Sequence, residues 1–405
     1  MSVATEVRAG AEPASPRWPR LVTLVLAATV LLAGATVGGL VKLWPHGPAR
    51  HVPGIKAVKT DGAVVQSVVE RRCSDLGFET CFRLGVKLLD GPDKGTTTTV
   101  VLGRTAGYNS VGVGEHIRVL RNPPPPPGFS GPSVGRYSFA DYDRRMPLAW
   151  MAAGFVVLLL LGSRLTGVRA LVGLVASLAL VVFFVIPAIL AGHSALAVAL
   201  VGSLAVLLVT IPISYGIGPK AVAAWLGTAL SLFVAVGLAA LFTHLTHLTG
   251  TDSEQAVNLA TSDNHVSLHG LLLAGMIVGA LGVLVDLTVS QSSTVMALRR
   301  ANRSLGFSGL FRGALAVGHD HIAATVNTLV FAYAGAALPI LLIFSVAGTS
   351  FTDAINSEAV AGEIVATLVG AIALIVSMPL TTALAAGLAT RTSVRQLGAE
   401  HGHVH

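Results

Sequence analysis

The stretch Gly279–Phe344 decides the fold, because it joins membrane-like segments to groups that membranes disfavour. It begins GALGVLVDLTVSQSSTVMALRRAN and, after a basic linker, ends GHDHIAATVNTLVFAYAGAALPILLIF. Both parts are apolar over lengths that suit a transmembrane helix, which needs roughly 20 residues. They nevertheless contain Asp286 and the run His319-Asp320-His321. Ionisable side chains in such segments are costly, so by default they indicate a functional site.

Composition places the whole chain in the same class. Hydrophobic residues make up 53% of the sequence and charged residues 12%, against about 25% charged in ordinary soluble domains. The formal net charge is +7, but the Lys and Arg outside residues 46–145 lie mainly in short gaps between apolar segments or in the two tails, where they orient helices. We therefore predict an all-α polytopic membrane bundle and exclude nucleic acid as a partner.

The apolar segments predict eight spans, each near the length that a bilayer requires. They are Leu21–Leu43, Pro147–Gly162, Val168–Leu190, Ser194–Tyr215, Ala221–His244, Leu268–Val289, Ala324–Val346 and Gly362–Ala389. Alternate gaps are rich in Arg, whereas the gaps after the fifth and seventh spans carry Asp and Glu without Lys or Arg. By the positive-inside rule both termini are expected in the cytoplasm.

This topology divides the chain into five parts. We expect a cytoplasmic tail (residues 1–20), a transmembrane anchor (21–43), an extracytoplasmic β-domain with a Pro-rich linker (46–145), a multi-helix membrane domain (147–389) and a cytoplasmic His-containing tail (390–405). The β-domain is predicted from Val- and Thr-rich runs bounded by Gly, Asp and Pro. They are Gly62–Glu70, Cys81–Asp90, Thr96–Leu102 and Glu115–Arg121. Four or five short strands suit a small barrel of the OB type.

Cys73 and Cys81, the only cysteines, flank a turn of this β-domain. In an oxidising compartment they are candidates for a disulfide across the hairpin. The alternative is two free thiols.

The polar groups of the opening stretch suggest a pathway. Asp286, Ser290 and Ser293 recur at helical spacing and share one helix face. With Asp320 and Asn327 they are expected near the cytoplasmic ends of their spans, lining one cavity. The alternative is that each carboxylate meets water or pairs with Arg299 or Arg312.

A second candidate site is a metal site at the opposite rim. His244 and His247 are three residues apart, His265 and His269 are four apart, and Asp252 lies in the same acidic loop. Imidazole and carboxylate ligands suit zinc or another transition metal. The alternative is a solvated loop. We predict no cofactor.

Enzyme signatures are missing from the sequence, which has no Walker A loop, GxSxG elbow, HExxH or kinase motif. An intramembrane hydrolase using Asp286 and Asp320 would need a GxGD-like context, which the sequence does not have. We therefore predict that the protein is not an enzyme.

The chain resembles the YibE/F family of bacterial multi-pass membrane proteins over roughly Val168–Ala386. The matching words are GALGVLVDLTVSQSSTV, the second segment quoted above, VRALVGLVASLALVVFFVIPAILAGHS and GEIVATLVGAIALIVSMPLTTALAA. The family commonly has a second Asp where this chain has Val285, and Arg where it has His319. The resemblance implies a multi-pass protein of the bacterial cytoplasmic membrane with a permease-like role. The matching site positions are Asp286, Ser290, Gln291, Asp320, His321, Asn327 and Tyr333.

The leading prediction is therefore a transporter or permease for a small solute or ion, embedded in membrane lipid. The first alternative is a scaffold or envelope-assembly protein that acts through its β-domain. The second is an intramembrane enzyme. The sequence leaves the substrate and the oligomeric state open.

Overall fold

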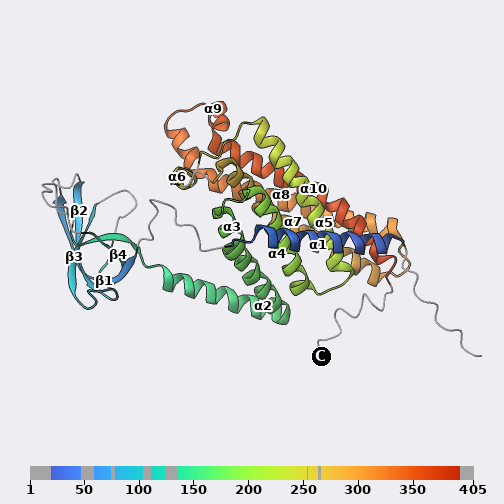
Figure 1. Cartoon of the computed structure of the whole chain (residues 1–405), viewed down its shortest axis with the longest axis horizontal. Coiled ribbons are helices and arrows are strands. Elements are labelled where there is room, and N and C mark those ends of the chain that lie inside the picture. The colour runs from blue at the N-terminus through green and yellow to red at the C-terminus, as the bar shows by residue number, and fades with distance from the viewer. Residues whose placement is uncertain are drawn as a thin grey trace, which may run out of the picture. The chain divides into compact units, whose positions relative to one another are not determined.

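The computed structural model describes residues 20–46, 59–73, 78–103, 111–123, 135–252, 254–262 and 266–392. Both predicted tails lie almost wholly outside this range, as do His265 and most of the Pro-rich linker. The chain forms two compact units, Pro53–Arg164 and Met1–Val52 with Leu165–His405, and Figure 1 labels their elements. We describe each unit by itself.

The first unit contains a small curled sheet. Its strands are β1 (Thr60–Cys73), β2 (Phe78–Leu88), β3 (Thr97–Gly103), β4 (His116–Arg121) and β5 (Tyr137–Tyr142). They are ordered β3-β2-β1-β4-β5 with antiparallel neighbours, and β3 also contacts β5. Four of them form where the sequence predicts strands, and β5 is the fifth.

Alternating side chains build the core of this sheet, as expected when one face of a strand is buried. Leu84, Val86 and Leu88 of β2 are fully buried, and Val100 and Ile117 lie with them in one cluster.

Cys81, also fully buried, is disulfide-bonded. Cys73 ends β1, but its side chain is not among the described ones. The predicted pairing of these two cysteines therefore stays a prediction.

The rest of the described chain is helical. The elements are α1 (Arg20–Leu43), α2 (Arg145–Leu180), η2 (Val181–Val185), α3 (Ile186–Leu190), α4 (Ala195–Tyr215), α5 (Pro219–Leu245), α6 (Glu254–Ser262), α7 (Leu268–Ala301), α8 (Phe307–Val346), α9 (Phe351–Asn356) and α10 (Glu358–Ala389). Among the described residues, seven helical segments are long and apolar enough to cross a membrane. The protein is thus built like a polytopic membrane protein.

The number seven differs from the predicted eight in one place. The spans predicted at Pro147–Gly162 and Val168–Leu190 belong to a single helical stretch, Arg145–Leu190. This stretch is broken at Arg164, whose φ of 47° and ψ of −127° are not helical. The break is also where the two compact units meet in the sequence.

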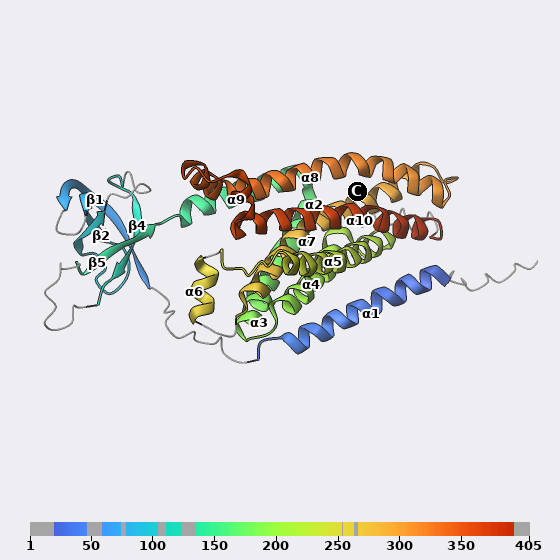
Figure 2. The ribbon, with the colours of Figure 1, turned by 90° about the horizontal axis from the view of Figure 1, so that it is seen from above.

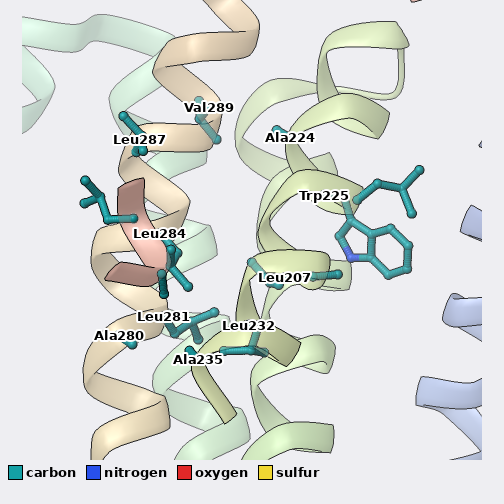
Figure 3. Packing of buried hydrophobic residues seen from close by; sticks show 14 of the residues in the cluster. Leu207, Ala224, Trp225, Leu232, Ala235, Ala280, Leu281, Leu284, Leu287 and Val289 are labelled. Carbon is teal, nitrogen blue, oxygen red and sulfur yellow. The ribbon is translucent and has the colours of Figure 1, made fainter. Parts of the chain in front are cut away.

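The helices of the second unit pack around α5, α7 and α10, which all contact one another. Figure 2 shows α8 at one side of this bundle and α1 at the other. The core mixes Leu with many Ala and Gly, and such small residues let membrane helices approach closely. In Figure 3, Leu281 and Leu284 of α7 lie beside Leu232 of α5.

Hydrogen bonds to one carboxylate show the relative directions of the three central helices. Glu358 at the start of α10 accepts hydrogen bonds from the backbone N–H groups of Thr249 (2.6 Å) and Gly250 (2.5 Å), just after α5. The hydroxyls of Thr249 and Thr251 donate to it at 2.9 Å. Gly250 also touches Leu268 at the start of α7. The helices α7 and α10 therefore begin where α5 ends, and both run antiparallel to α5.

Replacing Glu358 by Gln should destabilise the bundle by about 1–2 kcal/mol, because hydrogen bonds to an ionised group are stronger than neutral ones. A thermal melt of the purified protein checks this. Asp353→Asn is the control, since that carboxylate accepts a local hydrogen bond from the hydroxyl of Ser350 at the cap of α9. Equal melting of Glu358→Gln and the unmodified protein would contradict the prediction.

Candidate functional site

Both polar helices extend beyond the predicted spans, which places their carboxylates away from the helix ends. The helix α7 continues to Ala301 and α8 begins at Phe307. Asp286 is therefore fifteen residues, about 22 Å, from the end of α7, and Asp320 is thirteen residues, about 20 Å, from the start of α8. Both carboxylates therefore lie well inside their helices, and their place near the cytoplasmic ends of the membrane spans stays a prediction.

Asp286 and His321 meet across α7 and α8. The carboxylate Oδ2 and the imidazole Nε2 are 3.7 Å apart, and the side chains are 66% and 36% exposed. The His321 Nε2 atom itself is buried and has no hydrogen-bond partner in the described part of the chain. An ion pair forms here only when the imidazole is protonated.

Asp286 lies on a face of α7 that is made of small residues. We call this the glycine–aspartate face, and its members follow helical spacing: Gly275, Gly279, Gly282, Asp286, Ser290 and Ser293. The first four are exposed and the two serines are half-buried. A Cβ added at Gly275 or Gly282 would meet open space. The predicted common face of Asp286, Ser290 and Ser293 is therefore present, and three glycines extend it towards the start of α7.

Tyr333 of α8 borders the same face beside Gly279. A Cβ at Gly279 would lie 2.9 Å from the Tyr333 hydroxyl oxygen, so this hydroxyl lies over α7 there. Glu363 of α10 lies in the neighbourhood of that hydroxyl and is itself half-buried. Sequence reasoning missed Glu363 as a site residue. The available signal was that it is the one charge within the predicted span Gly362–Ala389.

Three other predicted pathway residues lie elsewhere. Gln291 is 2% exposed, and its Nε2 donates to the Ala314 carbonyl at 2.8 Å, tying α7 to α8. Asp320 and Asn327 are exposed positions of α8, and their spacing of seven puts them on one helix face. That face is opposite the one carrying Leu310, Ala314, Gly318 and Leu329, which α8 buries.

Arg299 is occupied elsewhere, so it is not the partner of Asp286. Its Nη1 donates to the carbonyls of Arg303 (2.5 Å) and Leu305 (2.8 Å), which closes the turn between α7 and α8.

The rim histidines are only partly described. His244 lies in the last turn of α5, His247 has a φ of 53°, and Nδ1 of His269 is 2.9 Å from the Leu248 carbonyl oxygen. Within the described ranges no three His, Cys, Asp or Glu residues are arranged to hold a metal. The predicted metal site includes His265, outside those ranges, and stays a prediction.

Comparison with known protein families adds the identity of the membrane part. The family model described as YibE/F-like protein matches residues 151–391. The chain belongs to this family. The match includes α7, α8 and α10, and with them the whole glycine–aspartate face, His321, Tyr333 and Glu363, whereas the sheet lies before it. The resemblance seen in the sequence of this YibE/F-like protein is thereby confirmed. No curated protein and no solved structure matches the chain.

Proposed function

We propose that this YibE/F-like protein is a permease for a small solute or ion, with its pathway along the glycine–aspartate face. The observation that carries this proposal is the approach of Asp286 and His321 at 3.7 Å in the interior of two long apolar helices. A charged side chain at the bilayer centre costs about 2.5–3.5 kcal/mol on insertion scales. A water-lined pathway over the exposed carboxylate would remove that cost.

The composition of the face supports the same function. Glycines leave room beside a helix backbone, and Ser290, Ser293 and the Tyr333 hydroxyl offer hydrogen bonds without charge. The ionisable groups along the pathway are Asp286, His321 and Glu363. An enzyme is not proposed, because the group facing Asp286 is an imidazole and not the second carboxylate that an aspartyl hydrolase needs.

The proposed topology has eight crossings of the bacterial cytoplasmic membrane and both termini in the cytoplasm. The stretch Arg145–Leu190 has 46 residues, about 69 Å as a helix, and the hydrocarbon core is about 30 Å thick. It is therefore long enough to cross twice, turning at Arg164. The sheet would lie outside, and its strand order with the β3–β5 contact fits the OB type.

Cysteine labelling in intact cells tests this topology. A membrane-impermeant thiol reagent should modify Val113→Cys, an exposed position of the sheet unit, and leave Ser304→Cys unmodified. Cys81 is buried in its disulfide and should not react without reductant. Labelling of Ser304→Cys, or failure to label Val113→Cys in folded protein, would contradict the model.

The permease itself is tested by ligand-induced stabilisation of the purified chain. Transition-metal ions, ammonium compounds and small organic solutes are added in choline chloride buffer. A ligand at 100 times its dissociation constant adds about 2.7 kcal/mol to stability. At least one should raise the melting temperature of the unmodified protein and not that of Asp286→Asn. If every ligand acts equally on both, the pathway is wrong and a scaffold role of the sheet unit is favoured.

A further inference from the structure

In the described part of the chain, one face of α8 is left uncovered. Over the most apolar stretch of α8 only 11% of the residues are buried, against 39% to 50% in α4, α5, α7 and α10. The exposed face follows helical spacing and consists of Ala316, Asp320, Ala323, Asn327, Phe331 and Ala334. We call it the Asn327 face. His321 and Tyr333, which meet α7, are not part of it, so it is separate from the glycine–aspartate face.

Asn327 places an amide where lipid cannot hydrogen-bond it. The residue follows the first residue of α8 by twenty positions and precedes the last by nineteen. It lies inside the apolar run Ile322–Phe344, and its side chain is exposed. Polar side chains in such runs are costly in hydrocarbon, and they commonly form hydrogen bonds with a neighbouring helix. A protein surface therefore covers the Asn327 face better than lipid does.

A second copy of this chain carries the groups that the Asn327 face needs. Two copies have the same orientation in the membrane, so a two-fold axis across the membrane brings each residue of the face opposite its own counterpart. An amide both donates and accepts hydrogen bonds, so two Asn327 side chains can satisfy each other. The apolar run Met146–Gly162, by contrast, has no charged, amide or hydroxyl side chain to offer. The helix α1 lies at the other side of the bundle (Figure 2).

The residues around Asn327 suit close contact between two such helices. The three alanines of the face are small, and small residues let membrane helices approach closely. Asp320 lies seven positions before Asn327, and exposed His319 precedes it. Each copy therefore offers an acidic and a basic group, and the carboxylate of Asp320 can accept a hydrogen bond from His319 of the partner subunit. The face is thus complementary to itself, as a two-fold contact requires.

We propose that the protein forms a parallel two-fold dimer through the Asn327 face of α8. The dimer goes beyond the proposed pathway, because this face can bind a second copy whether or not the glycine–aspartate face conducts a solute. The Asp320→Asn variant keeps a hydrogen-bonding side chain in the contact, so it should still dimerise.

Disulfide crosslinking of the full chain in cell membranes tests the contact. Oxidation of Ala323→Cys, which leaves the amide of Asn327 in place, should join two copies. Leu368→Cys, a 54% exposed position of α10, has the same native cysteines and should not join them. Equal crosslinking at both positions, or none at Ala323→Cys, would overturn the proposal.

The affinity between copies is the second measurement. Energy transfer between differently labelled copies is followed as added lipid dilutes the protein in liposomes. Asn327→Leu should weaken dimerisation about tenfold, because interhelical hydrogen bonds are lost, and Asn327→Gln, which keeps the amide, should weaken it less. Position 327 is exposed, so both variants should fold. Unchanged affinity of Asn327→Leu, or unmodified protein that is monomeric at every dilution, would overturn the proposal. None of these outcomes depends on transport, so the dimer and the pathway fail or succeed separately.

Discussion

Replacing Asp286 by Asn is expected to abolish binding or transport of the ligand and to leave the fold intact. The side chain is 66% exposed and its one described ion partner, His321, is 3.7 Å away. Exposed ion pairs contribute about 0–1 kcal/mol, so the melting temperature should change little. Function should change greatly, because the amide has nearly the same shape but cannot carry the negative charge or exchange a proton with His321.

The measurement is paired for each variant: thermal melting, and flux in proteoliposomes of the solute identified by ligand-induced stabilisation. Asp320→Asn is the matched control, because this carboxylate lies on the exposed face of α8 away from the helices that α8 packs against. It should retain both stability and flux. If Asp286→Asn melts several degrees lower and keeps its flux per folded molecule, Asp286 is structural.

Replacing Gly227 by Ala should give the largest loss of stability. The new Cβ would lie 2.1 Å from Thr381 Oγ1 and 2.9 Å from Thr381 Cβ. The latter atom is next to the α10 backbone and cannot move away by a rotamer change. Overpacking of this kind costs about 1–3 kcal/mol, which exceeds the gain of about 0.5–1 kcal/mol from replacing a helical Gly.

Gly237→Ala on the same helix is the control, since its Cβ would meet nothing within 4 Å. That variant should be neutral or slightly more stable in a thermal melt. Adding Thr381→Ala to Gly227→Ala should restore part of the loss, because the nearest clashing atom disappears. Equal stability of Gly227→Ala and Gly237→Ala would contradict the close packing of α5 and α10.

Much of this structure could be predicted from local patterns in the sequence. Alternating Val and Thr predict four of the five strands, and long apolar runs predict the helices that can cross a membrane. The spacing of Asp286, Ser290 and Ser293 predicts their common face. The ends of α7 and α8 are harder to predict from the sequence. The polar run after Val289 and the His-Asp-His cluster before Ile322 lower the hydropathy at places where the helices in fact continue. Tertiary packing keeps these turns helical.

Contacts between helices could not be predicted from the sequence. Gln291 follows Ser290 and looks like a pathway residue, but one position is 100° around a helix, and it is buried against α8. The proximity of Asp286 to His321, and not to Asp320, depends on the rotation of α8.

The central claim, that water reaches the glycine–aspartate face, is tested most directly by cysteine accessibility along α7 in membranes. A small hydrophilic thiol reagent reacts with thiolates, which form in water and not in lipid. The reagent should modify Gly282→Cys, Ser290→Cys and Ser293→Cys. A ligand whose binding depends on Asp286 should slow this modification. Leu368→Cys, an apolar position of α10 that is 54% exposed, should stay unmodified. If the three face positions are as unreactive as Leu368→Cys in protein that melts normally, lipid or another helix covers the face and the permease proposal is contradicted.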